Sequence, residues 1–502
     1  MDNNTLELVD YAIRKNLIKE VDRRWAINRI MNAIGSDFIS GSAACGKPLE
    51  SILESLTNIA IERRICSDNP SSRDQFENNL MGILTPAPHE VCDTFYSLFR
   101  KSSKSATNWF YKFSQDCNYI RSGRVSRDIK WKYASEYGEL DITINLSKPE
   151  KDPLAIAAQK NNSNIAYPEC QLCSENEGYA GRIGHPSRQN LRLIPITLAG
   201  EDWYFQYSPY VYYNEHCIVL NSQHVPMHIG NDTFRRLLEF VTKFPHYFLG
   251  SNAELPIVGG SILSHEHYQG GRYTFAMERA DIETNYNFSN YPDIKAGILK
   301  WPMSVIRLQC NEPTRLAELA DRLLCCWRTY TDTSAMIFSE TDGLPHNTIT
   351  PIARRKGDQY ELDLVLRNNL VTDEHPLGLY HPHEELHHIK KENIGLIEVM
   401  GLAVLPSRLL SELSSVADAI VEGRSLFSDP ALVKHAAWAE NLCKKYTFTK
   451  ENIMTILRNE VGSAFCEVLN DAGVYKRNEW GKTCFLRFLD YTNKQLNITR
   501  VK

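Results

Sequence analysis

The chain has 502 residues, of which 43% are hydrophobic and 23% charged, a composition that excludes a disordered protein and predicts a globular fold. Its 56 Lys and Arg residues are outnumbered by 61 Asp and Glu, and the formal net charge of −5 argues against sequence-independent binding to nucleic acid, which needs a cationic face. No apolar stretch approaches the roughly 18 residues that a spanning helix requires, so we expect no membrane segment.

Residues 1–125 are predicted to form a helical N-terminal region. Apolar residues recur there at helical spacing, as in Val9, Ile13 and Leu17, and again between Phe95 and Phe113. Nothing in this region suggests catalysis, and we interpret it as an accessory layer of helices.

The pattern changes near residue 135, where segments with alternating apolar side chains begin. Alternation predicts strands at 140–146, 192–197, 203–207, 217–220 and 360–366. Helical periodicity predicts helices at 231–249, 313–328, 430–443 and 450–469. Strands interrupted by only a few helices favour an α+β fold over a strictly alternating one. We divide the chain at these changes of pattern into the regions 1–125, 126–280, 281–410 and 411–502.

A glycine-flanked run with two histidines, from Pro256 to Gly271, is the first chemical motif. If residues 262–269 are extended, His265, His267 and Gln269 project from one face of a strand. A neutral imidazole is a competent nucleophile near neutral pH, and a neighbouring amide N–H can stabilise charge on phosphoryl oxygens. The pattern therefore suits phosphoryl chemistry, but HxH pairs are common by chance, and surface histidines on a glycine-rich turn are the alternative.

Cys170 and Cys173 have the spacing at which two thiolates of one turn share a zinc ion. There is no second such pair, so a tetrahedral site needs other ligands, and the candidates nearest in sequence are His216, His224, His228 and His265. Two reduced, buried cysteines without a metal are the alternative. The 13 cysteines are odd in number and show no disulfide framework, so we expect a cytoplasmic protein.

These motifs occur in a characteristic order: the CxxC pair, His224, the segment 257–271 with its HxHxQ pattern, and the segment 392–406. In this order and in length the chain resembles the galactose-1-phosphate uridylyltransferase family of the histidine-triad superfamily, in its longer bacterial form. The resemblance implies a duplicated, histidine-triad-like antiparallel sheet core. Regions 126–280 and 281–410 would be its two halves, with helical additions at both ends of the chain.

The same resemblance implies an activity and partners. The chain would transfer the uridylyl group from UDP-glucose to galactose 1-phosphate in galactose catabolism, releasing glucose 1-phosphate and UDP-galactose. The transfer would be a double displacement through a uridylyl-histidine intermediate. We expect a homodimer, with neither nucleic acid nor a membrane as a partner.

The resemblance also assigns roles to individual residues. His267 would be the nucleophile, and Gln269 would hydrogen-bond the phosphoryl oxygens. A zinc ion would be bound by Cys170, Cys173, His224 and His265. Substrate contacts would come from Asn252, Gly260, Ser261, Lys148 and Lys151, the two lysines standing where the family's shorter form has arginines.

In two places the chain departs from the shorter form of the family. That form has a second metal site made of a Glu and three His, two of them in a late HxH motif. The matching strand here, residues 360–367, contains no histidine, so we expect no iron. The hexose loop, residues 392–396, is also less aromatic, which leaves the individual sugar contacts and the preferred hexose epimer open.

A competing motif lies between His383 and His387, which match the HExxH pattern of zinc proteases. Pro382 directly precedes the first histidine, where a proline inside the motif's continuous helix would cost about 3 kcal/mol. Glu385 also places a charge where the motif has an apolar residue. We interpret residues 380–388 as an exposed polar turn, with substrate binding by its histidines as the alternative.

Two other functions are compatible with the sequence. Another nucleotidyltransferase or phosphorylase of the superfamily would release the nucleotide to inorganic phosphate rather than to a hexose phosphate. A non-catalytic, zinc-stabilised binding protein would need His265 and Cys170 but not His267.

Overall fold

The structure, a computed structural model, describes residues 3–38, 46–147, 167–182, 184–260 and 262–498. The chain divides into two compact units. Unit 1 comprises Met1–Arg127, Ser147–Val211 and Glu215–Val225. Unit 2 comprises Asp128–Leu146, Tyr212–Asn214 and Pro226–Lys502.

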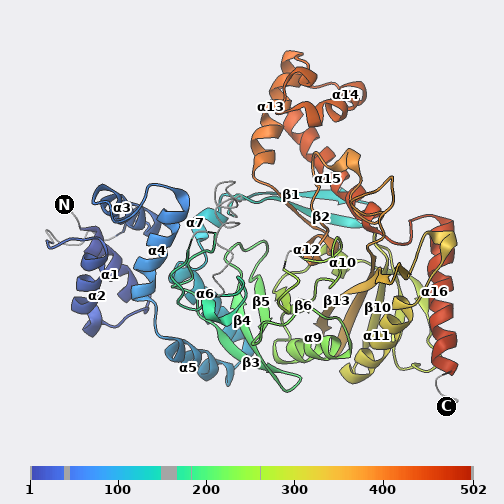
Figure 1. The fold of residues 1–502 in the computed structure, drawn as a ribbon, viewed down its shortest axis with the longest axis horizontal. Coiled ribbons are helices and arrows are strands. Elements are labelled where there is room, and N and C mark those ends of the chain that lie inside the picture. Colours follow the sequence, from blue (N-terminus) through green and yellow to red (C-terminus); the bar gives the residue numbers. More distant parts are fainter. Residues whose placement is uncertain (1–2, 39–45, 148–166, 183, 261, 499–502) are drawn as a thin grey trace. The chain divides into compact units, whose positions relative to one another are not determined.

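Unit 1 begins with amphipathic helices, coloured from blue to cyan in Figure 1. They are α1 (Asn4–Arg14), α2 (Arg23–Ala33), α3 (Leu49–Glu62), α4 (Pro70–Leu84), α5 (Pro88–Phe99), α6 (Ser103–Asp116) and α7 (Ser122–Val125), with a 3-10 turn η1 (Glu20–Asp22). The spacing of Leu8, Val9 and Ala12 buries one face of α1. Within the described residues, helices therefore make up most of the chain between Asn4 and Val125, while the boundaries of the four sequence regions stay predictions.

The rest of unit 1 contains an antiparallel meander of β3 (Ile194–Leu198), β4 (Glu201–Tyr207) and β5 (Cys217–Asn221). Phe95 of α5 and Phe110 of α6 pack against Phe205 of β4, with ring centroids 6.3 and 5.7 Å apart. Trp203 and Tyr207 alternate with polar residues on the same strand and are fully buried. A short turn, η2 (Ser174–Asn176), directly follows Cys173.

Unit 2 is built on antiparallel strands in the order β7-β6-β13-β14-β10-β9-β8. Their bounds are β6 (Phe248–Gly250), β7 (His267–Gly271), β8 (Ile282–Tyr286), β9 (Lys295–Leu299), β10 (Val305–Cys310), β13 (Asn347–Lys356) and β14 (Gln359–Asn368). Two helices, α9 (Asn231–Lys243) and α11 (Pro313–Arg328), contact each other and these strands.

The alternate side chains of these strands belong to a large core that includes Phe248, Ile352 and Val365. The same core takes in a small sheet of β1 (Ile129–Ser135), β2 (Gly138–Ile144) and β15 (Leu402–Leu405). It also takes in α10 (Ala276–Arg279), α12 (Leu396–Val399) and one face of α15 (Ile453–Ala472).

The chain repeats one succession of elements: three antiparallel strands, a helix, then an antiparallel strand pair. The first copy is β3, β4, β5, α9, β6 and β7, and the second is β8, β9, β10, α11, β13 and β14. Short pieces interrupt the second copy: η3 (Thr333–Ala335), β11 (Glu340–Thr341) and β12 (Leu344–Pro345). The predicted α+β class with a duplicated antiparallel sheet is thereby confirmed.

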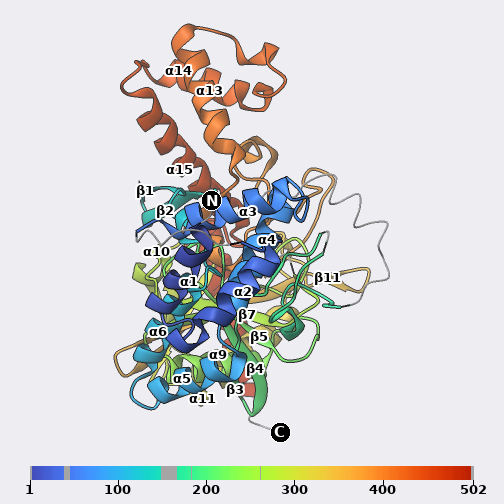
Figure 2. The same cartoon turned by 90° about the vertical axis from the view of Figure 1, so that its left-hand side faces the viewer.

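The C-terminal part of unit 2 is helical, as predicted. It contains α13 (Arg408–Glu422), α14 (Ala436–Lys445), α15 and α16 (Glu479–Ile498), with the turns η5 (Leu426–Ser428) and η6 (Val433–His435). Parts of α13, α14 and α15 enclose a second, smaller core around Val416, Leu442 and Leu457. Figures 1 and 2 show α13 and α14 projecting away from the strands of this unit.

Several sequence predictions have the wrong bounds, and the helix predicted at 430–443 begins only at Ala436. The helix predicted at 231–249 ends at Lys243, because Pro245 disfavours helical backbone at Phe244, and the chain re-enters the sheet as β6. The segment predicted as extended from 262 to 269 becomes a strand only at His267.

Within the described residues, no helix is both long enough and apolar enough to cross a bilayer. All the cysteines among these residues are free thiols.

Candidate active site

The HxHxQ motif passes from a loop into β7. His267 is the first residue of the strand, and Gln269 pairs with Gly250 of β6. Strand alternation places His267 and Gln269 on one face and Tyr268 on the other. His265 precedes the strand and takes its position from a loop. The prediction that the three side chains share one strand face therefore agrees with the structure for His267 and Gln269, but not for His265.

His267 is almost completely buried, and its ring is oriented by one backbone contact. Its Nδ1 atom lies 2.8 Å from the carbonyl oxygen of His265. A carbonyl oxygen only accepts, so Nδ1 carries the proton and Nε2 keeps its lone pair. Burial lowers the pKa of His267 to about 4, outweighing the raising effect of that hydrogen bond. The imidazole is therefore neutral at neutral pH, with Nε2 in the form that a nucleophile needs.

The CxxC turn is ordered by hydrogen bonds around the two thiols. The Sγ atoms of Cys170 and Cys173 are 3.5 Å apart, and Cys173 Sγ lies 3.2 Å from Nδ1 of His224. The Asn176 side chain donates to the carbonyl oxygens of both cysteines, at 2.8 Å each. Burial raises the pKa of the Cys173 thiol to about 12, so a thiolate here needs a compensating cation.

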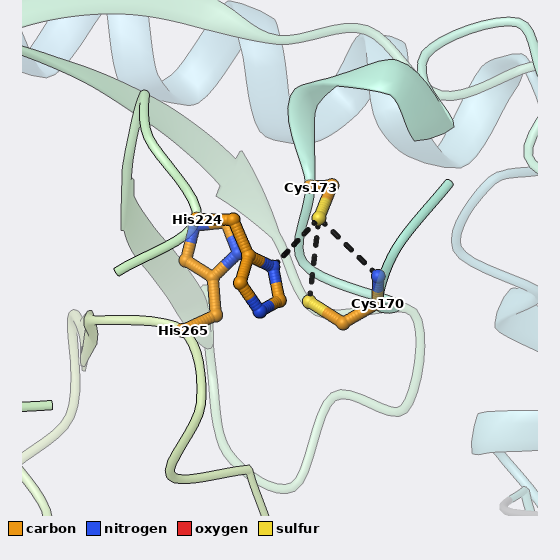
Figure 3. A group of neighbouring side chains, drawn as sticks. All are labelled: Cys170, Cys173, His224 and His265. Atoms are coloured by element: carbon orange, nitrogen blue, oxygen red, sulfur yellow. Dashed lines mark hydrogen bonds between the residues drawn. The ribbon is translucent and has the colours of Figure 1, made fainter. Parts of the chain in front are cut away.

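Figure 3 shows Cys170, Cys173 and His224 together with His265. The potential ligand atoms of all four lie within 4.8 Å of one another. Among the residues that the structure describes, this is the group that could hold a metal ion, and neither His216 nor His228 belongs to it. Two thiolates and two imidazoles are the donor set and number that tetrahedral zinc takes in structural sites. The four residues therefore fit zinc.

The predicted substrate contacts are only partly visible. Asn252 is buried, and its Oδ1 accepts a hydrogen bond of 2.8 Å from the amide of Leu396. Gly260 lies against it so closely that a Cβ would meet Asn252 Nδ2 at 2.8 Å. Ser261, Lys148 and Lys151 lie outside the described residues, so their proposed roles stay predictions.

The residues of the competing motif do not form a metal site in the part of the chain that is described. A 3-10 turn, η4 (Glu384–Leu386), stands where a protease would have a continuous helix. His383 Nδ1 lies 3.4 Å from Asp471, and His387 Nε2 lies 2.8 Å from the carbonyl oxygen of Pro382.

The interpretation of 380–388 as an exposed turn is wrong at both ends. His381 and His388 are buried, and His388 Nδ1 lies 3.0 Å from Nδ1 of His435. The contact depends on a turn 47 residues further along the chain, which the local sequence does not reveal.

The sequence did not single out Arg236, Glu266 and Tyr268, which contact one another at the motif. Glu266, between the two histidines, contacts Arg236 of α9 and Tyr268 of β7. The alternation of β7 and the apolar face of α9 signal that these side chains point into the protein, but not that they meet.

Two family models match the chain. Galactose-1-phosphate uridyl transferase, N-terminal domain, matches residues 16–226, and Galactose-1-phosphate uridyl transferase, C-terminal domain, matches residues 240–440.

Several bacterial proteins named galactose-1-phosphate uridylyltransferase are similar over nearly their full length. The protein of Clostridium acetobutylicum is 49% identical over 488 residues, which cover 96% of this chain and 98% of that protein. The protein of Bacillus subtilis is 48% identical over 495 residues, covering 96% of each. The protein of Streptococcus pneumoniae is 45% identical over 493 residues, covering 98% of this chain and 99% of that protein. A solved structure of yeast Ap4A phosphorylase has a TM-score of only 0.33 and 11% identity, and covers 69% of this chain and 95% of that chain.

Proposed function

The chain belongs to the galactose-1-phosphate uridyl transferase family, and we propose that it moves the uridylyl group of UDP-glucose to galactose 1-phosphate. The products are glucose 1-phosphate and UDP-galactose, and the reaction serves galactose catabolism in the cytoplasm. The single observation that best supports a catalytic role is the neutral, buried His267 with its Nδ1 proton held by a backbone carbonyl.

In the proposed first half-reaction, Nε2 of His267 attacks the α-phosphorus of UDP-glucose. The bond from that phosphorus to the bridging oxygen breaks, and glucose 1-phosphate leaves with the electron pair. The uridylyl group stays on Nε2 as a phosphoramidate. Because Nδ1 keeps its proton, the ring becomes cationic, and the His265 carbonyl oxygen 2.8 Å away faces this charge.

In the second half-reaction, a phosphate oxygen of galactose 1-phosphate attacks the same phosphorus and the P–N bond breaks. UDP-galactose forms and the imidazole returns to its neutral state. Two steps avoid placing two hexose phosphates, each a dianion, around one phosphorus at the same time. One sugar-phosphate pocket then serves both halves of the reaction.

Gln269 is proposed to donate its amide N–H to the phosphoryl oxygens, since it shares the strand face of His267. Asn252, Gly260, Ser261, Lys148 and Lys151 are proposed as substrate contacts. Asn252 supports this role indirectly, because it holds the amide of Leu396 at the end of the predicted hexose loop.

Zinc bound by Cys170, Cys173, His224 and His265 is proposed to stabilise the fold beside the nucleophile, with no iron elsewhere. A bound cation would hold both thiols as thiolates, despite the burial of Cys173. We also propose a homodimer, on the family resemblance.

Exchange between labelled glucose 1-phosphate and UDP-glucose tests the proposed activity. The protein should catalyse this exchange without galactose 1-phosphate, and should form UDP-galactose when galactose 1-phosphate is added. Release of nucleotide to inorganic phosphate alone would support a phosphorylase instead, and no turnover in either assay would support a binding protein.

A further inference from the structure

The residue between the two motif histidines, Glu266, is held on the side of the chain opposite to the proposed chemistry. Its Oε1 accepts a hydrogen bond of 2.9 Å from Arg236 Nη1 and one of 3.1 Å from the Tyr268 hydroxyl. Arg236 Nη1 also lies 3.3 Å from that hydroxyl. We refer to Arg236, Glu266 and Tyr268 as the clamp.

The clamp is isolated from water. Arg236 is 8% exposed, Glu266 is 5% exposed and Tyr268 is fully buried. A carboxylate and a guanidinium at such depth are tolerated only when they are paired and hydrogen-bonded. Burial and the adjacent Glu266 raise the pKa of Tyr268, so its hydroxyl stays protonated and donates. Arg236 and Tyr268 together therefore hold the Glu266 side chain in place.

A fixed Glu266 side chain restrains the peptide unit before it. That unit carries the His265 carbonyl, which accepts the Nδ1 proton of His267 at 2.8 Å. Tyr268 restrains the chain on the other side of His267. It follows His267 in β7, and its hydroxyl donates a hydrogen bond to the Glu266 carboxylate. The backbone on both sides of the imidazole is thus tied to α9 through one carboxylate.

We propose that Arg236, Glu266 and Tyr268 are positioning residues which hold the His265 carbonyl against Nδ1 of His267 and so keep Nε2 unprotonated and aimed at the phosphorus. In this proposal they act through the backbone around His267 and not on the reacting atoms. This inference rests on the proposed function, in which His267 is the nucleophile.

The consequence for catalysis is specific. Neutral histidine has two tautomers, and only the one with the proton on Nδ1 leaves Nε2 as a nucleophile. A loosened carbonyl allows the inactive tautomer and a wider range of ring orientations. Loss of clamp contacts should therefore lower the rate of the chemical step and leave substrate affinity unchanged.

Tyr268→Phe is the informative variant, because it removes one donor to Glu266 while keeping the ring and the Arg236 pair. Tyr273→Phe is the matched control. It also removes a tyrosine hydroxyl that donates to a carboxylate in unit 2, that of Asp141 at 2.8 Å, but it does not touch the clamp. Glu266→Gln is a second variant that keeps the shape of the side chain and removes its charge.

The experiment measures single-turnover release of glucose 1-phosphate from UDP-glucose, together with ¹⁵N chemical shifts of labelled histidine, assigned with His267→Ala. Tyr268→Phe should slow the release about 3- to 10-fold, the loss expected for one hydrogen bond, with an unchanged half-saturating UDP-glucose concentration. Its His267 signals should shift toward the tautomer with the proton on Nε2. Glu266→Gln should slow the release and shift the His267 signals to a larger extent. Tyr273→Phe should change neither the release rate nor the His267 signals.

A Tyr268→Phe protein that folds, releases glucose 1-phosphate at the wild-type rate and keeps the wild-type tautomer would overturn the clamp. So would a loss fully explained by a smaller folded fraction, measured by thermal unfolding of the same samples. Failure of the proposed function looks different, because the wild-type protein itself would then release no glucose 1-phosphate in a single turnover.

Discussion

The Nδ1 atom of His267 lies 2.8 Å from the carbonyl oxygen of His265, two residues earlier in the chain. His265 thus belongs to both parts of the site, the proposed nucleophile and the metal group, through different atoms. The backbone of His265 orients the proposed nucleophile, while its imidazole belongs to the group that fits zinc. A substitution of the His265 side chain can therefore separate the two roles.

His265→Asn should weaken zinc binding at least about tenfold, because one of four ligands is lost. The carbonyl that holds His267 remains, so the variant should still form a uridylyl adduct in the molecules that stay folded. Metal analysis after purification without chelators checks the first expectation, and adduct formation per folded molecule checks the second. Cys170→Ser is the matched ligand change, and it should lower stability more than chemistry. Wild-type protein that carries no zinc would contradict the metal assignment.

Gln269→Ala should slow both half-reactions by roughly 10²–10³, the usual effect of removing one donor that stabilises a developing anion. The reason is that the amide would act on the phosphoryl oxygens in the transition state more than in the bound substrate. Half-saturation by UDP-glucose should change little by comparison. Gln359→Ala, an exposed glutamine at the start of β14, is the control and should be neutral. An equal effect of both changes would argue against the role of Gln269.

Gly260→Ala should disturb substrate binding through Asn252. A methyl group at this position would lie 2.8 Å from Asn252 Nδ2, and the Asn252 side chain is held by the Leu396 amide. The side chain can make room only by giving up that bond, which frees the predicted hexose loop. We expect weaker saturation by hexose phosphates, measured in steady-state kinetics. Gly230→Ala, where the nearest atom is 3.3 Å away, is the control.

The His388–His435 pair predicts acid sensitivity of the fold. The pKa of His388 is lowered to about 3, mainly by burial, with neighbouring His435 and Lys434 acting in the same direction and Glu412 opposing them. Between the ordinary value of 6.5 and about 3, the unfolded chain binds a proton that the folded chain does not. His388 therefore does not reduce the stability of the fold above pH 6.5, and it reduces that stability progressively as the pH falls toward 3.

The measurement is the free energy of unfolding in urea at about pH 7 and about pH 5. His388→Asn should reduce the difference between the two values by up to about 2 kcal/mol, since about 1.4 kcal/mol per pH unit comes from one proton. A change of the exposed His89 to Asn serves as the control. An unchanged difference in His388→Asn would mean that His388 is not held neutral in the fold.

The sequence predicted those features that depend on neighbouring residues. The helix at 313–328 has the predicted bounds, because Pro313 suits a first helical position and apolar residues follow at regular spacing. The helix predicted at 231–249 is too long, because Pro245 ends the helix although the apolar pattern continues beyond it. The metal group was predicted by the order of motifs along the chain and by family resemblance, not by periodicity.

Features that depend on distant contacts were missed. Arg236 has an ordinary place on an amphipathic helix, and only the fold brings it to Glu266, 30 residues later. His388 was expected in an exposed turn, and its burial comes from packing against His435 and Trp438. In both cases a polar side chain is buried because it has a partner in a distant part of the sequence, and no local sequence pattern predicts that partner.

The covalent intermediate on His267 is the central claim, and incubation with UDP-glucose alone tests it most directly. Without an acceptor, the protein should release one equivalent of glucose 1-phosphate and gain the mass of one uridylyl group. Digestion at alkaline pH, where a phosphoramidate survives, should place the label on His267, and His267→Ala should take up none. No mass gain, or a label found on His265 instead, would contradict the account.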